Sequence, residues 1–471
     1  WSRKRAVEAV MTGDRNGAIA RVEDAFDNGA LLDVLNERIK IESTSQEPER
    51  APELARYLHE NIGPALEVEL GCTWEVFQNP VDAGPLLIAE RHEGDRLPTV
   101  LVYGHGDTVR GQDESWRNGL KPWEITVEGD RWYGRGTADN KGQHTINFAA
   151  LAAVLQERGS LGFNLRVLVE TGEEMGSKGL REFAAANKDK LRADVLIASD
   201  GPRVQADRPT IFLGSRGNTN FSLTINARDG GHHSGNWGGL ISNPAVQLVN
   251  AISTLVDGKG RLQLDALKPP PISNAVRAAL ADLEVDGGPG APVIEPEWGA
   301  AGLTPNERVF AWNTLEILAM ESGNPATPVN AIPPSAMAVC QIRFVAGSDY
   351  EAFLPAIQAH LVANGYDMIE AAPTRGAMAA TRTPLDDPWV DRALASLAKT
   401  TGEKPALLPS LGGSIPNDVF TETLGMPTIW VPHSYAGCSQ HAPDEHALGP
   451  TLRSGLRVMA GLFWDVGALS R

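Results

Sequence analysis

Short apolar runs alternate with polar, glycine-rich loops and amphipathic stretches in the N-terminal part of the chain. Residues 99–103, 163–170 and 193–199 have the length and β-branched content of buried strands, and each run is followed by a loop with charged side chains. Residues 145–156 are apolar at helical spacing. This succession predicts an α/β fold with a mixed, mainly parallel sheet and helices on both faces.

Hydrophobic periodicity predicts further elements on either side of this core. The segment 18–41 has a helical pattern, which Asn28-Gly29 would interrupt. The remaining predicted elements are helices at 47–62, 389–400 and 450–469 and strands at 73–77, 85–89 and 428–431.

The pattern changes near residue 208, which indicates an inserted domain. Residues 210–226 alternate as strands do, and 258–299 are rich in proline, glycine and acidic residues, as expected of an excursion from the core. The other predicted elements of this part are helices at 243–256 and 350–365 and strands at 337–345 and 367–371. We expect a catalytic domain made of 1–207 and 379–471, with 208–378 as a smaller α+β domain.

Composition narrows the classes of partner. The net charge of −17 argues against nucleic acid or an anionic membrane surface, because both need a basic protein surface. Cys72, Cys340 and Cys438 are far apart and form no CxxC motif, which favours a reducing, cytoplasmic compartment. No apolar run is long enough to span a membrane. Because the first residue is Trp1, a cleaved export signal is the alternative to a cytoplasmic protein.

Ligands for hard metal ions follow several predicted strands or lie in glycine-rich turns. These are His105 and Asp107, Asp139, Glu173 and Glu174, Asp200, and His441 with Glu445. Imidazole and carboxylate ligands suit Zn²⁺ or Mn²⁺ better than metals that prefer thiolates. A catalytic zinc takes three protein ligands, so the set exceeds the need of one ion. The surplus predicts a two-metal centre.

Each of these residues also has a simpler structural explanation. Glu173-Glu174 is typical of an acidic helix N-terminus, Asp139 and Asp200 are typical of turns, and His441 would suit the start of a helix. These explanations do not account for the fact that imidazole and carboxylate side chains follow several strands of the same predicted domain.

Five motifs in a fixed order carry a resemblance to a known family. They are GHGDT at 104–108, GRGTADNKG at 134–142, TGEEMGS at 171–177, SDGP at 199–202 and QHAPDE at 440–445. In this order they resemble the signature of metallopeptidase family twenty, which includes carnosinases, aminoacylases, succinyl-diaminopimelate desuccinylase, acetylornithine deacetylase and glutamate carboxypeptidase. The resemblance extends over almost the whole chain. It implies a zinc exopeptidase-like fold with an inserted lid or dimerisation domain.

The resemblance implies a pair of divalent metal ions and a ligand set for each. His105 and Asp200 would bind one ion, Glu174 and His441 would bind the other, and Asp139 would bridge both. Zn²⁺ is the expected metal, with Mn²⁺ or Co²⁺ as alternatives.

The resemblance also implies roles for residues that do not bind the metal ions. Asp107 would orient His105, and Glu173 would be the general base that deprotonates a water shared by the two ions. The latter role also follows physically, because a carboxylate beside a ligand is close to that water without being used in coordination. His233, rather than the adjacent His232, would reach the site of a partner subunit in a homodimer and stabilise an oxyanion. The alternative is a histidine that caps a turn.

Substrate-binding residues are also implied by the resemblance. Arg343 in QIRFV would bind a substrate carboxylate, since a guanidinium can do so with two parallel hydrogen bonds. Asn330 matches a lid motif, and Gly413 and Ser414 match a glycine-rich loop of carnosinase-like members that would bind the terminal carboxylate. The alternatives are a solvated strand charge for Arg343 and a plain turn for the loop.

The predicted function is dinuclear metal-dependent hydrolysis of peptide or N-acyl amide bonds in small substrates. The HSGNWGG and GGSIP segments favour a carnosinase-like dipeptidase. An N-acyl-amino-acid deacylase or an aryl-amide or amine hydrolase of the same family is the alternative. A ligand-binding member without turnover is disfavoured, because Glu173 and the whole ligand set are present. A serine hydrolase using Ser234 or Ser414 would lack a nucleophile-elbow motif.

Overall fold

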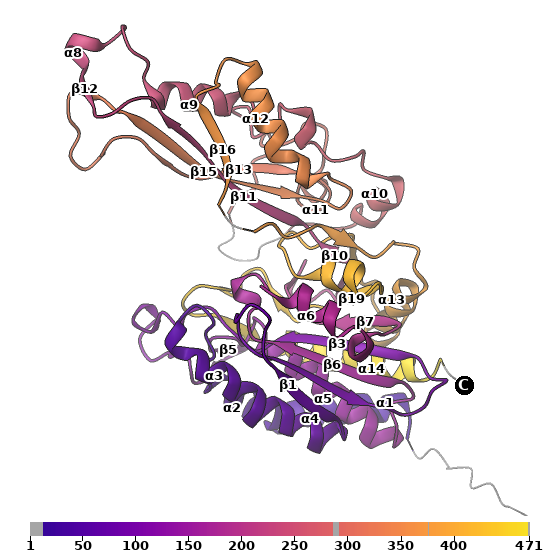
Figure 1. Cartoon of the computed structure of the whole chain (residues 1–471). Coiled ribbons are helices and arrows are strands. Elements are labelled where there is room, and N and C mark those ends of the chain that lie inside the picture. The colour runs from indigo at the N-terminus through magenta and orange to yellow at the C-terminus, as the bar shows by residue number, and fades with distance from the viewer. Residues whose placement is uncertain (1–12, 286–291, 375, 470–471) are drawn as a thin grey trace, which may run out of the picture.

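Two main sheets organise the chain, one above the other in Figure 1. The computed structural model describes residues 13–285, 292–374 and 376–469. The lower sheet has eight strands in the order β1 (Thr73–Phe77), β2 (Leu86–Arg91), β6 (Asn164–Glu170), β3 (Thr99–His105), β7 (Val195–Ala198), β19 (Thr428–Trp430), β9 (Thr210–Phe212) and β18 (Ala406–Leu408). Its central strands β6, β3, β7 and β19 run parallel to one another, and so do β9 and β18. The pairs β1–β2, β2–β6 and β19–β9 are antiparallel. The predicted mixed, mainly parallel sheet is confirmed.

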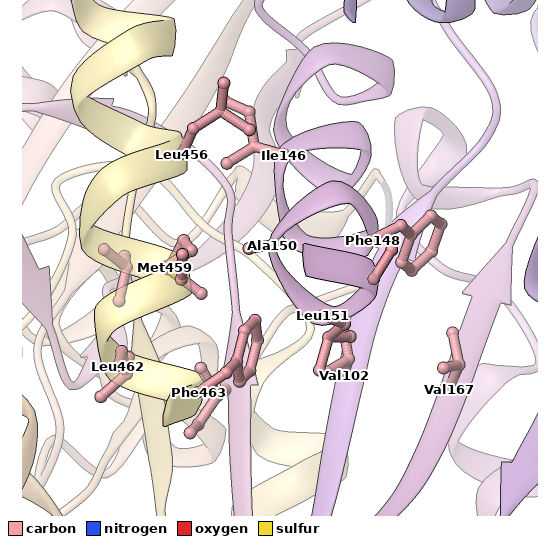
Figure 2. Packing of buried hydrophobic residues seen from close by; sticks show 14 of the residues in the cluster. Val102, Ile146, Phe148, Ala150, Leu151, Val167, Leu456, Met459, Leu462 and Phe463 are labelled. Atoms are coloured by element: carbon pink, nitrogen blue, oxygen red, sulfur yellow. The ribbon is translucent and has the colours of Figure 1, made fainter. Parts of the chain in front are cut away.

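Alternate residues of β3 point to opposite faces of this sheet, as strand geometry requires. Val100 and Val102 join the core on the face covered by α1 (Arg15–Asp27), α2 (Ala30–Ile39), α4 (Gly63–Leu70), α5 (Lys141–Arg158), α13 (Pro388–Thr401) and α14 (Gly449–Gly467). Leu101 and Tyr103 join the core on the other face, with α6 (Leu180–Ala186), α10 (Asn274–Leu280), α11 (Pro305–Phe310) and the π-helix η7 (Val419–Thr423). Figure 2 shows Val102 of the sheet beside Leu151 of α5, and α14 runs alongside α5. Burial on both faces explains why β3 is a nearly continuous apolar run.

The N-terminal helical region differs in extent from its prediction. The break at Asn28-Gly29 is present, because Gly29 adopts a left-handed φ of 86° between α1 and α2. The next helical segment consists of η1 (Pro48–Arg50), α3 (Ala51–Arg56), η2 (Tyr57–Ile62) and α4. It ends at residue 70 rather than at the predicted residue 62, because residues 63–70 carry further apolar side chains into the core.

The upper sheet is antiparallel and has the order β13 (Thr314–Glu321), β15 (Ser335–Phe344), β11 (Gly217–Asn226) and β16 (Ile369–Pro373). One face of it packs against α9 (Pro244–Ser253) and α12 (Phe353–Ala363) through residues such as Phe221 and Cys340. The other face carries polar side chains at alternate positions, including Asn218 and Arg343. This face turns toward the site described below.

Three details of this part differ from the sequence pattern. Strand β13 was not predicted, because a bulge between Ile317 and Ala319 interrupts its alternation. The stretch 258–299 contains α10 in addition to irregular chain, and its residues 286–291 lie outside the described residues. Strand β9 belongs to the lower sheet although it follows residue 208. The division at 207 and 378 stays a prediction, and its first segment begins with residues outside the described ranges.

None of the helices in the described ranges is both long enough and apolar enough to cross a lipid bilayer.

Candidate metal centre and substrate cavity

Three adjacent strands of the lower sheet deliver acidic and histidine side chains to one edge. His105 is the last residue of β3, Glu173 and Glu174 lie in the 3₁₀ turn η4 (Glu173–Met175) after β6, and Asp200 follows β7. Because β6, β3 and β7 are parallel neighbours, their carboxyl ends meet at this edge. The site therefore lies where open α/β sheets bind their ligands.

Two glycines flank His105 because bulky side chains pack closely on both sides of the strand end. A Cβ atom on Gly104 would lie 2.6 Å from the Cβ of His144, and one on Gly106 would lie 2.4 Å from Cδ1 of Tyr57. Tyr57 and His144 are themselves buried and joined by a hydrogen bond of 2.7 Å between the hydroxyl and Nε2. The GHG pattern is thus a packing requirement that fixes the backbone carrying His105.

The structure brings five of the predicted ligands together in two groups that share Asp139. His105, Asp139 and Asp200 form one group, and Asp139, Glu174 and His441 form the other. Nε2 of His105 lies 2.9 Å from Oδ1 of Asp139 and 3.8 Å from Oδ2 of Asp200. Nε2 of His441 lies 3.0 Å from Oδ2 of Asp139 and 3.1 Å from Oε2 of Glu174. Each oxygen of Asp139 thus faces a different histidine.

The local backbone places Asp139 with its carboxylate between the two histidines. Asp139 is joined to Asn140 by a cis peptide bond, and Asn140 begins helix α5 as its N-cap. The side-chain amide of Asn140 donates to the carbonyl of Ser199, one residue before Asp200. This bond links the loop after β5 (Arg131–Tyr133) to the end of β7.

Glu173 lies beside this cluster but belongs to neither group. Its Oε2 atom is 4.0 Å from Nε2 of His105. Burial, together with the negative charges of Glu174, Asp200 and Asp139, raises the pKa of Glu173 well above its usual value. A carboxylate in this position can accept a proton at the centre of the cluster.

The carboxylates of the cluster repel one another, and the neighbouring histidines do not neutralise all of their negative charge. Burial and the charge of Asp139 raise the pKa of Glu174 to about 7 and that of Asp200 to about 6. Hydrogen bonds to Asp139 and Glu174 raise the pKa of His441 to about 11. For Asp139, the hydrogen bonds from both histidines outweigh burial and lower its pKa. Cations at this position would relieve the repulsion among the carboxylates.

Asp107 contacts three parts of the site. Its backbone oxygen lies 3.1 Å from Nδ1 of His105, and its Oδ1 atom lies 3.4 Å from the same nitrogen. Both carboxylate oxygens also accept backbone hydrogen bonds, Oδ1 from Glu173 and Oδ2 from Glu174. Asp107 is fully buried, so these contacts are shielded from water.

A cavity of about 810 Å³ joins the cluster to the upper sheet. Besides the acidic residues and His441, its wall includes Arg343 and Gln341 of β15, Asn218 and Asn220 of β11, and the loop 411–415 with Gly413 and Ser414. Nη1 of Arg343 donates to Oγ of Ser414 at 2.9 Å, and its Nε donates to Oε1 of Gln341 at 3.0 Å. Gln341 in turn donates to Asn220 at 2.9 Å. Two of the predicted substrate-binding regions therefore meet in one polar wall.

The structure does not bring His233 or Asn330 to this cavity. His233 lies in β12 (His232–His233), which pairs with β14 (Ala331–Ile332), and Figure 1 shows β12 and α8 (Ser234–Trp237) at the end of the upper sheet remote from the lower one. Nδ1 of the exposed His233 accepts the backbone hydrogen of Gly235, and the carbonyl of Asn330 accepts that of Ser234. Within one chain, these residues form a turn structure.

Sequence reasoning missed several residues of the site. Gln440 donates to Oδ2 of Asp139, and its position directly before His441 was the available signal. Asn218 and Asn220 were also missed, although the alternation of β11 places both on the polar face of the upper sheet. Their register opposite Arg343 and Gln341 could not be read from one strand alone.

A family model for peptidase family M20/M25/M40 matches residues 101–465, a range that contains the metal cluster and most of the cavity. The chain belongs to this family. The resemblance drawn from the five motifs is thereby confirmed.

Relatives in the M20/M25/M40 family support the same grouping. The chain is 29% identical over 274 residues to the Beta-Ala-His dipeptidase of Mus musculus, an alignment that covers 54% of each protein. It is 34% identical over 202 residues to the cysteinylglycine-S-conjugate dipeptidase of Corynebacterium striatum, covering 42% of this chain and 43% of the relative. The chain thus spans about half the length of the curated relatives it matches.

A solved M20 family structure has the same fold over nearly the whole chain. The metallo-carboxypeptidase Sso-CP2 from Sulfolobus solfataricus superposes with a TM-score of 0.78 at 25% identity, covering 93% of this chain and 99% of that protein. The likeness includes the upper sheet, so this sheet is part of the family's architecture.

The donor set of this M20/M25/M40 member fits a pair of divalent ions. Both groups combine imidazole and carboxylate ligands, which Zn²⁺ and Mn²⁺ accept. Oε1 of Glu174 is buried and has no hydrogen-bond partner among the described residues. A buried carboxylate oxygen without a partner is costly, and a cation would satisfy it.

Proposed function

We propose that this chain is a dinuclear metal-dependent hydrolase of dipeptide-like substrates. The observation that carries the proposal is the sharing of Asp139 by two ligand groups, with Oε2 of Glu173 4.0 Å from Nε2 of His105. His105 and Asp200 would hold one ion, and Glu174 and His441 the other. Zn²⁺ suits these ligands best, and Mn²⁺ or Co²⁺ would fit the same donor types.

The chemistry would be divided between the ions and the protein. When bound, two divalent ions supply Lewis acidity that activates water and polarises the scissile carbonyl. Glu173 accepts the proton of the attacking water, which its raised pKa favours, and delivers it to the leaving nitrogen. Asp107 keeps Glu173 in place through the backbone and keeps His105 in one ring orientation.

The polar wall of the cavity favours substrates with a free carboxylate. Arg343 forms no ion pair with a carboxylate among the described residues. Burial lowers the pKa of its guanidinium group. Arg216 lies nearby, and burial together with the positive charge of Arg343 lowers the pKa of Arg216 to about 10. The Arg343 guanidinium lines the cavity and would attract an anionic group of the substrate. Ser414 and the backbone of Gly413 would complete the carboxylate subsite.

We further propose that the functional unit is a homodimer formed through residues 208–378. Strand β13 is an edge strand whose Met320 is exposed, and α9 exposes Val246 and Val249. Exposed apolar side chains on an edge strand and on a helix of the same domain are typical of an interface. A partner would bring His233 and Asn330 to the cavity, where His233 would stabilise the oxyanion.

The compartment is a separate proposal. Cys72, Cys340 and Cys438 are all unpaired and buried. Free thiols are typical of the reducing cytoplasm, so we propose a cytoplasmic enzyme.

A substrate panel with a general-base variant tests the activity. Metal-loaded protein is assayed on β-Ala-His, Cys-Gly and a series of N-acyl amino acids, and Glu173→Gln is expected to retain both ions while kcat falls by about 10²–10⁴-fold. Glu182→Gln on the exposed face of α6 is the matched control and should leave kcat unchanged. Turnover restricted to N-acyl amino acids would identify a deacylase. Near-full turnover by Glu173→Gln would overturn the general-base role.

A further inference from the structure

Glu445 is a buried carboxylate that belongs to neither ligand group. It lies four residues after His441, directly before β21 (His446–Leu448), and its sequence context made it a candidate metal ligand. The structure gives it a different set of contacts, all with the loop that carries Asp139.

Three backbone amides converge on one oxygen of Glu445. Its Oε1 atom accepts hydrogen bonds from the nitrogens of Gly136 at 3.0 Å, Ala138 at 3.1 Å and Asp139 at 3.2 Å. Its Oε2 atom accepts from Nη1 of Arg135 at 2.6 Å. Both carboxylate oxygens are therefore fully engaged by residues 135–139, which leaves no direct role in holding an ion.

These bonds connect two loops that are far apart in sequence. One loop carries Asp139 and the other carries His441, and the two side chains meet at 3.0 Å. The backbone carbonyl of Glu445 adds a further bond by accepting from the nitrogen of Gly134 at 2.9 Å. Glu445 thus ties the loop of Asp139 to the loop of His441, beside the pairing of β5 with β21 and the hydrogen bond from Gln440 to Asp139.

We propose that Glu445 is a positioning residue that holds Asp139 against His441, so that the affinity for the ion bound by Asp139, Glu174 and His441 depends on a carboxylate that does not touch it. This inference rests on the proposed metal-dependent function. Outer groups that orient metal ligands contribute about 10–100-fold to metal affinity. The effect should be stronger for this ion than for the ion bound by His105 and Asp200, because only the former uses a ligand from each of the two loops.

Glu307 provides a matched control for a purely structural role. Like Glu445, it is a buried carboxylate that binds an arginine, Arg277, and a backbone amide, that of Thr304 at 2.9 Å. It lies in α11, and it belongs to neither ligand group. Loss of either carboxylate should reduce fold stability, but only the loss of Glu445 should alter the metal centre.

The test is a metal titration of full-length wild type, Glu445→Gln and Glu307→Gln after removal of metal with a chelator. We expect wild type and Glu307→Gln to bind two Zn²⁺ ions alike, whereas Glu445→Gln binds the ion held by Asp139, Glu174 and His441 about 10–100-fold less tightly. Its kcat at limiting Zn²⁺ should fall and recover as Zn²⁺ is raised, with KM unchanged. If Glu445→Gln does not fold, Glu445→Asp replaces it in the titration, because aspartate keeps the negative charge on a shorter side chain. A smaller loss of metal affinity is expected for Glu445→Asp.

If Glu445→Gln and Glu445→Asp bind both ions with wild-type affinity, the positioning inference is overturned and the proposed function is not. An equal loss of metal affinity in Glu307→Gln would have the same consequence. Fewer than two ions in active wild type would instead overturn the proposed dinuclear function, and the positioning role with it.

Discussion

Oδ1 of Asp107 lies 3.2 Å from the backbone nitrogen of Glu173 and accepts its hydrogen bond. The second oxygen, Oδ2, accepts from the nitrogen of Glu174 at 3.1 Å. The residue expected to orient His105 therefore also fixes the turn that carries Glu173, the proposed general base, and Glu174, a proposed ligand of the second ion. One buried carboxylate thus couples three functional groups that come from two strands.

Asp107→Asn should damage the metal centre more than the fold. An amide side chain has one acceptor oxygen, so its NH₂ group would face either a backbone N–H or His105. We expect metal affinity to fall about 10–100-fold and kcat to fall with it. Metal titration and steady-state kinetics measure these effects. Asp95→Asn, at a highly exposed position, is the control, and an equal change there would contradict the assignment.

Gly106→Ala should destabilise the protein by about 1–3 kcal/mol, because its Cβ would approach Cδ1 of Tyr57 to 2.4 Å and overpack the strand end. Urea unfolding of the metal-free protein measures the change in the free energy of unfolding. Gly94→Ala is the control, because its Cβ would come no closer than 3.7 Å to Leu97 and should cost less than about 0.5 kcal/mol. Equal free energies for the two variants would show that the close approach is not required.

The clustering of the candidate ligand residues was predictable from sequence, because strand ends and residue types that bind metals are both local signals. His105, Glu174 and Asp200 each follow an apolar run, and parallel strands bring such positions to one edge. The break at Gly29 was likewise visible, since a left-handed φ favours glycine.

The remaining features depend on contacts between distant segments. The polar wall needs the register of β11 against β15, which pairs Asn218 with Arg343 and Asn220 with Gln341. Glu445 looked like a ligand because residue type does not reveal which partner a carboxylate meets, and the structure directs it to backbone amides instead. The role of His233 stays a prediction, because it requires a second chain.

Metal-free protein should lose stability as the pH rises from about 5 to 9. In the folded state, hydrogen bonds to Asp139 and Glu174 raise the pKa of His441 to about 11. Burial raises the pKa of Glu174 to about 7. The unfolded values are about 6.5 and 4.3, so the folded state binds more protons between these limits. Stability contributed by protonated His441 is complete below about pH 6.5 and is lost as the pH approaches the folded value.

Thermal unfolding with excess chelator, and again with Zn²⁺, measures this dependence. Ligation requires neutral imidazole and ionised carboxylates, so Zn²⁺ binds more tightly at higher pH and the stabilisation by metal should grow over the same range. His441→Gln should reduce the slope above about pH 7 in the metal-free protein. A melting temperature of metal-free protein that rises with pH would contradict the charge arrangement described for the cluster.

Mixed dimers test whether each active site contains residues of two chains. In a dimer of one His233→Ala subunit and one Glu173→Ala subunit, one site has both defects and the other has neither. Random mixing makes about half of the dimers mixed, so about a quarter of the wild-type specific activity should return, although each variant alone is inactive. Glu173→Ala mixed with Glu174→Gln is the control, since both residues act within one chain and no site regains function. Activity that stays at the level of the separate variants in the first mixture would show that His233 does not act across the interface.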